Sequence, residues 1–274
     1  MIALRFAGFA QSQDQIICNR VFSYAFEHKL IDKPIGEVIG IVGRQFLGKP
    51  YEPNTLEQPG AEQLVVNLRS FDCVTYVENV LALARCVKKN RLSFDAFQQE
   101  LQTVRYRNGY INGYAGRLHY FTDWIDDNQK KKILKDVTRE LGGGPYHKTI
   151  DFMTSHRDLY RQLANDSAFN QMKTIEETLS HRSLYFIPTS AFHNPHSAIQ
   201  TGDIIAITTK QNGLDVAHTG IAVRLEDGSL HYLHAPNIKD TVRISQETLS
   251  AYVQKHSSFT GIVVSRAVEP EKEN

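Results

Sequence analysis

The chain contains few cysteines and almost no net charge. Its 274 residues include only Cys18, Cys73 and Cys86, and the formal net charge is +1. An odd, widely spaced set of cysteines does not form a disulfide framework, and no CxxC zinc pair is present. A charge so close to zero creates no field that would attract nucleic acid or an anionic membrane, so we expect neither partner.

Long hydrophobic runs and metal-binding motifs are also lacking. No apolar segment approaches the roughly 20 residues of a membrane helix. No HExxH motif or similar ligand set occurs, so we expect neither a metal nor another cofactor. Gly8-Phe9-Ala10 resembles a small-x-small cleavage site, which reads either as the end of a secretory signal or as an ordinary extension. We favour a periplasmic or secreted location, and the sequence sets no oligomeric state.

Helical patterns come first along the chain and strand patterns last. We predict helices over 14–29, 34–47 and 73–89, one starting near Ser93, two or three within 107–183, and an extended segment at LVVNL. Short β-branched segments follow, namely DIIAITT, VAHTGIAVRL, SLHYLHA and TGIVVS. This order predicts an α+β fold with an antiparallel sheet. We predict one catalytic domain over 1–274, with N-terminal helices over 1–48 and a helical and loop insertion over 91–183.

Cys73 opens the best-patterned helix of the chain. The N–H groups and partial positive charge at a helix start favour a thiolate, and the same N–H groups can stabilise an oxyanion. Cys73 is therefore a candidate nucleophile, against the plainer interpretation of a small buried core residue. Cys86, which lies further along the same helix among leucines and valines, and Cys18 are interpreted as packing residues.

His218 is the candidate base, because it interrupts an apolar strand between small residues and so leaves room for a substrate. The plainer interpretation is a histidine at the surface end of a strand. A nucleophilic thiol needs such a base, and the base needs an orienting partner. The order of an early helical cysteine and a later strand histidine is typical of papain-like enzymes.

The strand after His218 offers two partners, His231 and His234, which point to opposite faces. A five-residue loop over 224–228 would set His234 directly opposite His218. A two-residue Asp-Gly turn would instead bring His231 to the face of His218, and a bulge could change either parity. We favour His234.

Several strings of the sequence are similar to known proteins. PY near 50, FDCVTYVE at 71–78, GD at 202–203, HTGIAV at 218–223 and LHA at 233–235 resemble the NlpC-type cell-wall cysteine peptidases. EQLVVNLRSFDCVTYVE, YRNGY, RLHYFTDWIDDN, LGG and GDIIAITT resemble more closely the N-acetylmuramoyl-L-alanine amidase-like branch. One departure is Asn54, where the branch is expected to have Gly, and Asn tolerates the left-handed conformation that such a turn needs.

The resemblance implies a papain-like core and hydrolysis of the amide between N-acetylmuramic acid, in its anhydro form, and L-alanine of peptidoglycan fragments. It implies a triad of Cys73, His218 and His234, with Tyr51 near the oxyanion and the substrate. Arg69 and Asp72 are candidates for binding the charged ends of the peptide. Their plainer interpretation is a solvated arginine and a helix cap.

Three other functions compete with this one. An NlpC-type endopeptidase would cut the bond between D-glutamate and the diamino acid of the stem peptide. An inactive module would bind the muropeptide without cutting it, although all three triad residue types are present. A metal-dependent amidase is disfavoured by the lack of a ligand motif.

Overall fold

The computed structural model describes residues 11–192, 198–237 and 239–271. Gly8-Phe9-Ala10, which resembled a cleavage site, lies outside this part. The helices are α1 (Gln13–Glu27), α2 (Ile35–Arg44), α3 (Cys73–Lys88), α4 (Phe94–Arg105), α5 (Phe121–Lys130), α6 (Phe152–Ser155), α7 (Asp166–Ser180) and α8 (Leu249–Lys255). The strands are β1 (Leu134–Asp136), β2 (Gly144–Tyr146), β3 (Leu184–Pro188), β4 (Ile204–Thr209), β5 (Val216–Arg224), β6 (Leu230–His234), β7 (Arg243–Ile244) and β8 (Phe259–Ala267).

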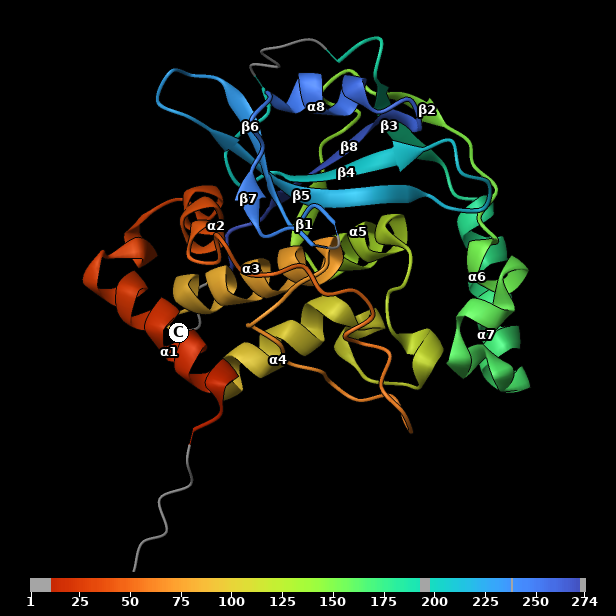
Figure 1. Ribbon diagram of the computed structural model, residues 1–274, viewed down its shortest axis with the longest axis horizontal. Helices are drawn as coiled ribbons and strands as arrows, with labels where there is room; N and C mark the ends of the chain where they lie inside the picture. The colour runs from red at the N-terminus through yellow and green to blue at the C-terminus, as the bar shows by residue number, and fades with distance from the viewer. Residues whose placement is uncertain (1–10, 193–197, 238, 272–274) are drawn as a thin grey trace, which may run out of the picture.

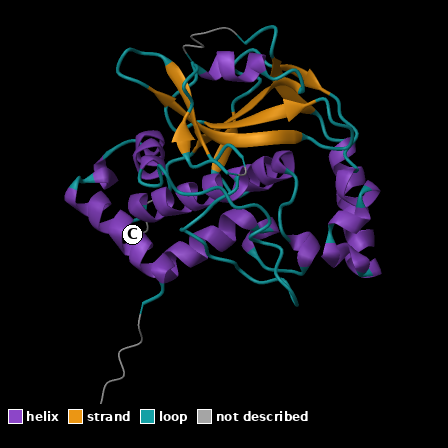
Figure 2. Cartoon of the chain, viewed as in Figure 1, coloured by secondary structure: helices purple, strands orange, loops and turns teal. Residues whose placement is uncertain are grey.

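The strands form one antiparallel sheet in the order β2-β3-β8-β4-β5-β6-β7, and β1 pairs with β8. Helices α2, α3 and α5 lie under one face of this sheet, and α8 lies on the other (Figure 1). Helices α1 and α4 lie beyond α3, and α6 and α7 lie at one side (Figure 2). The mixed α+β architecture with an antiparallel sheet confirms the coarse fold prediction.

Alternation along the central strands divides the core beside the sheet into two parts. Ile204, Ile221 and Leu233 pack against the large helical cluster, whereas Ile205 and Tyr232 join the cluster beneath α8. Successive strand residues point to opposite faces, so β4, β5 and β6 each contribute to both clusters. This is why these strands read as almost continuous apolar runs in the sequence.

Helix α3 is almost wholly buried, and it carries charge into the interior. Glu78 forms an ion pair with Arg105 of α4, with 2.7 Å between the carboxylate Oε2 and the guanidinium Nε. The two side chains are 2% and 1% exposed. The pair joins α3 to α4, and the loss of either partner would leave a buried charge without compensation.

Some elements differ from the predictions. The helix predicted over 34–47 ends at Arg44, because the chain then turns into Gly48 at φ 81°, where the N–H donates to Val242 O. LVVNL, predicted as an extended segment, belongs to no helix or strand. The predicted insertion also contains β1 and β2, which are too short to show a pattern in the sequence. Ser93 caps α4 as predicted, and Asn54 has φ 60°.

Candidate functional site

Cys73 is the first residue of α3, and a capping box fixes this helix start. The Asp72 carboxylate accepts from the Thr75 N–H at 2.7 Å, and the Thr75 hydroxyl accepts from the Asp72 N–H at 2.9 Å. An aspartate N-cap followed by a side chain that reaches back is a strong local signal for a helix start. The cap therefore determines where the sulfur of Cys73 leaves the backbone.

Thr219 attaches this helix start to β5. Its hydroxyl donates to the carbonyl oxygen of Cys73 at 2.8 Å. Thr219 directly follows His218, so the same bond holds the nucleophile candidate against the strand segment that carries the base candidate. Helix α3 contacts β5 and lies below it in Figure 1.

The two predicted histidines are in direct contact. His218 Nε2 lies 2.7 Å from His234 Nδ1, and the rings are 7% and 0% exposed. Because this contact uses Nε2 of His218, its Nδ1 is the nitrogen left to face another group. Among the described residues, His234 Nε2 is buried without a hydrogen-bond partner.

The pairing of β5 with β6 differs from the predicted register in detail. Ile221 faces Leu233 and Val223 faces His231, so the hairpin is centred on Asp227 and its loop spans 225–229. This register places His234 beside Gly220 rather than directly opposite His218. The displacement is two residues, which preserves the face, so His234 still meets His218 along a diagonal.

His231 lies on the other face of β6 and makes different contacts. Its ring nitrogens lie 2.9 Å from Ser245 O and 2.9 Å from the Ser229 hydroxyl. Both ring nitrogens of His231 thus contact residues other than His218. The structure brings His234, and not His231, to the base candidate.

The protonation of the cysteine differs from the expectation of a stabilised thiolate. Burial and the neighbouring Asp72 carboxylate raise the pKa of Cys73 to about 12, although hydrogen bonds from Thr219 and from the Cys73 N–H oppose this. Burial, together with His256, lowers the pKa of His218 to about 4. At neutral pH the pair is therefore a thiol and an uncharged imidazole, because desolvation outweighs the helix dipole.

The other predicted residues lie in distinct environments. Tyr51 is half-buried, and burial and the charges of Cys73 and Asp72 raise its pKa to about 12. Asp72 acts as the helix cap described above. Arg69 is largely exposed and pairs with Asp14 of α1 at 3.3 Å. Tyr51 is thus close enough to Cys73 to respond to a charge on the sulfur, whereas the contacts of Arg69 are with α1.

Two further tyrosines were missed from the sequence. Tyr232 stacks on His234 with ring centroids 4.7 Å apart, and Tyr252 of α8 meets the same ring edge-on at 5.1 Å. A charge on Cys73 would raise the pKa of both phenols, as it does for Tyr51. Tyr232 lies two residues before His234 on β6, so both side chains are on the same face of the strand. No local sequence pattern connects Tyr252 to the site.

In the ranges that the structure describes, no group of three histidine, cysteine, aspartate or glutamate side chains is arranged to hold a metal ion. No helix there is long and apolar enough to cross a membrane.

The other two thiols, Cys18 and Cys86, are both fully buried in the core. Cys73 is the one thiol in these ranges that is not fully buried.

A family model described as AmiA-like, N-acetylmuramoyl-L-alanine amidase-like, matches residues 41–262. No curated protein matches the chain significantly. Among solved structures, an N-acetylmuramoyl-L-alanine amidase from Bacteroides uniformis is similar, with 39% identity and a TM-score of 0.80. The match covers 85% of this chain and 98% of that one.

Two other solved structures are similar in fold. A protein from Bacteroides fragilis, named a candidate xylanase, shows 35% identity and a TM-score of 0.76 over 82% of this chain and 99% of that one. A protein from Legionella pneumophila shows 24% identity and a TM-score of 0.70, over 95% of this chain and 96% of that one.

Proposed function

Because the chain belongs to the N-acetylmuramoyl-L-alanine amidase-like family, we propose that it is a cysteine amidohydrolase acting on peptidoglycan fragments. The bond cut is the amide between N-acetylmuramic acid, in its anhydro form, and L-alanine. The core is papain-like in the NlpC sense, within one catalytic domain over 1–274. N-terminal helices over 1–48 precede it, and the insertion over 91–183 shapes the substrate cleft.

The observation that supports this proposal most is the buried 2.7 Å contact between His218 and His234, beside a helix that begins with a cysteine. In the proposed triad, Cys73 is the nucleophile, His218 the base and His234 the orienting residue. A base held by a second side chain next to a nucleophile is the arrangement that covalent catalysis requires.

The tautomers follow from these roles. To accept the thiol proton, His218 must have a free lone pair on Nδ1, so it carries its own proton on Nε2. That N–H then donates to His234 Nδ1, which leaves the proton of His234 on Nε2. His234 thus fixes the orientation of the base without carrying charge.

The reaction proceeds in two steps. As the Cys73 sulfur attacks the lactyl carbonyl of N-acetylmuramic acid, its proton passes to His218, since the resting pair is uncharged. The imidazolium then protonates the leaving amine of L-alanine, and the C–N bond breaks to give a thioester. Water, deprotonated by the same imidazole, hydrolyses the thioester and regenerates the thiol.

The oxyanion of each step needs hydrogen-bond donors. Backbone N–H groups in the first turn of α3 are available, because the Asp72 side chain occupies only that of Thr75. The Tyr51 phenol, whose pKa is raised to about 12, keeps its proton at physiological pH, so it can donate as well. Arg69 and Asp72 remain candidates for contacts with the charged ends of the peptide.

Digestion of purified anhydromuropeptides, followed by mass spectrometry, tests this function. Wild type should release a peptide-free sugar and an intact stem peptide, and Cys73→Ala should release neither. Products cut between D-glutamate and the diamino acid would indicate an endopeptidase instead. Binding without any product would indicate the inactive module.

A further inference from the structure

A surface cavity of about 720 Å³ lies between α4 and the loop that follows it, and neither Cys73 nor His218 lines it. Its wall is made of one face of α4 together with the loop over 108–110. Side-chain amide, carboxylate and aromatic groups meet there, among them those of Asp95, Gln98, Gln102 and Tyr110. The proposed reaction uses none of these groups.

An exposed aromatic ring stands at the edge of this cavity. Tyr110 is 73% exposed, which is a large apolar area to leave in contact with water. In the described part of the chain, the side chains of Tyr110, Asp95 and Gln98 make no hydrogen bond with another residue. Their donors and acceptors are therefore free to bind a ligand.

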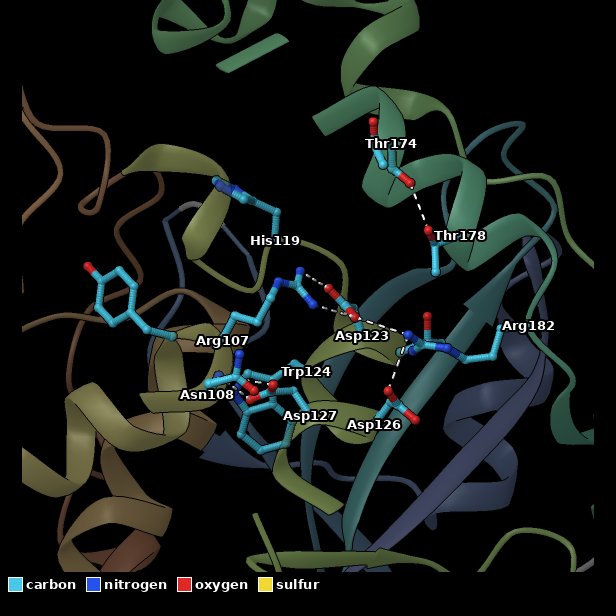
Figure 3. Close-up of polar contacts among 12 residues, drawn as sticks. Arg107, Asn108, His119, Asp123, Trp124, Asp126, Asp127, Thr174, Thr178 and Arg182 are labelled. Atoms are coloured by element: carbon cyan, nitrogen blue, oxygen red, sulfur yellow. Dashed lines mark hydrogen bonds and ion pairs between the residues drawn. The ribbon is translucent and has the colours of Figure 1, made fainter. Parts of the chain in front are cut away.

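The loop that carries Tyr110 is held rigidly by buried acids of α5 (Figure 3). Arg107 forms an ion pair with Asp123 at 2.5 Å, and the backbone N–H of Asn108 donates to the Asp127 carboxylate at 3.1 Å. The Gln102 amide donates to Gly109 O at 3.0 Å. A loop fixed in this way presents its aromatic ring at little cost in conformational entropy.

The loop turns through two left-handed residues. Asn108 has φ 55° and Gly109 has φ 81°. Asparagine and glycine are the residues that adopt this conformation at the least cost, so the local sequence is compatible with the tight turn before Tyr110.

The charges of the cavity favour a neutral ligand. The ammonium group of Lys131 is paired with Asp127 at 2.6 Å, so it is not free to attract an anion. The lone carboxylate of Asp95 can accept hydrogen bonds from hydroxyl groups. Amides that donate and accept, next to an aromatic face, match the hydroxyl and acetamide groups of a sugar.

We propose that this cavity is a glycan subsite that binds an N-acetylated amino sugar of peptidoglycan, with the Tyr110 ring stacked on the sugar and the Asp95 and Gln98 side chains hydrogen-bonded to it. The choice of sugar rests on the proposed function. The subsite would hold a sugar apart from the amide that is cut, since neither Cys73 nor His218 lines the cavity.

Tetra-N-acetylchitotetraose is a suitable probe, because it has the acetamido sugars but no muramoyl amide. Calorimetric titration into the full chain should show binding, and Tyr110→Ala should weaken it by about tenfold or more. Tyr110→Phe, which keeps the ring, should bind within about threefold of wild type. Phe26→Ala is the matched control, since Phe26 is a 75% exposed ring on α1, and it should bind as wild type does.

The absence of binding by wild type, or equal binding by Tyr110→Ala, would overturn the subsite. Equal binding of cellotetraose, which has no acetamide, would overturn the proposed sugar. Because the probe cannot be hydrolysed by an amidase, these results are independent of turnover. An active amidase that ignores the probe removes the subsite alone, and an inactive chain that binds it removes the proposed reaction alone.

Discussion

Replacing His234 by alanine is the most informative single change at the site. With the proposed tautomers, the substitution removes the acceptor of the hydrogen bond that His218 Nε2 makes at 2.7 Å. His218 is only 7% exposed, so its N–H would be left buried without a partner. An unpaired buried donor costs about 1–3 kcal/mol.

The cost applies most strongly when His218 carries a positive charge, that is, during attack and departure of the amine. The same 1–3 kcal/mol added to the barrier lowers kcat by about 5- to 150-fold. His234→Asn should recover part of the loss, because the amide oxygen can accept the same bond. Steady-state hydrolysis of a purified muropeptide measures the effect.

His231→Ala is the matched control. His231 lies on the same strand and is also buried, but its ring contacts Ser245 and Ser229 rather than the base. It should destabilise the fold to a similar extent while changing kcat by less than about threefold. If His234→Ala keeps wild-type kcat, or if His231→Ala lowers kcat as much, the assignment of the orienting residue is refuted.

Three other predictions concern α3. Alkylation of Cys73 by iodoacetamide should accelerate steadily from pH 6 to 9, because the ionised fraction of a thiol with a pKa of about 12 rises over that whole range. A rate that reaches a plateau near neutral pH would contradict the assignment of Cys73 as a thiol and His218 as a neutral imidazole. Asp72→Asn keeps a capping side chain but removes a charge that raises the pKa of Cys73. Alkylation of Cys73 at pH 8 should therefore be faster than in wild type. An unchanged or slower rate would count against that electrostatic effect. Glu78→Ala leaves Arg105 buried without its partner. Urea denaturation should show that the free energy of unfolding falls by about 3–5 kcal/mol. A decrease below about 1 kcal/mol would mean that water reaches the Arg105 charge.

The helices and strands with a clear hydrophobic periodicity could be predicted from the sequence. Helix α3 follows from its cap and its apolar face, and β4, β5 and β6 follow from β-branched segments separated by turns. β3 was not predicted, since a five-residue segment with little alternation gains its stability from pairing with β8, which is distant in sequence.

The partner of His218 could be predicted from the sequence in part. Parity along β6 separates His234 from His231, so the face could be predicted from the sequence. The register could not, because the hairpin loop shifted by one residue at each end, which moved the pairing by two. The choice of His234 survived because a shift of two residues keeps each side chain on its face.

The ionisation of Cys73 could not be predicted from its position. A helix start favours the thiolate, but the packing of β5 and of Tyr51 around the sulfur became visible only in three dimensions. Tyr252 was missed for the same reason, since α8 packs on the face of β6 that carries His234 only once the chain has folded. Burial decides the balance here, and burial depends on the whole fold.

The proposed function depends above all on a covalent bond between Cys73 and the sugar acid. Rapid acid quenching of a reaction with excess anhydromuropeptide, followed by proteolysis and mass spectrometry, would detect that thioester directly. We predict a Cys73 peptide heavier by the anhydromuramoyl acyl group, and no such adduct in Cys73→Ala. An adduct on another residue, an adduct containing stem-peptide amino acids, or full turnover by Cys73→Ala would contradict it.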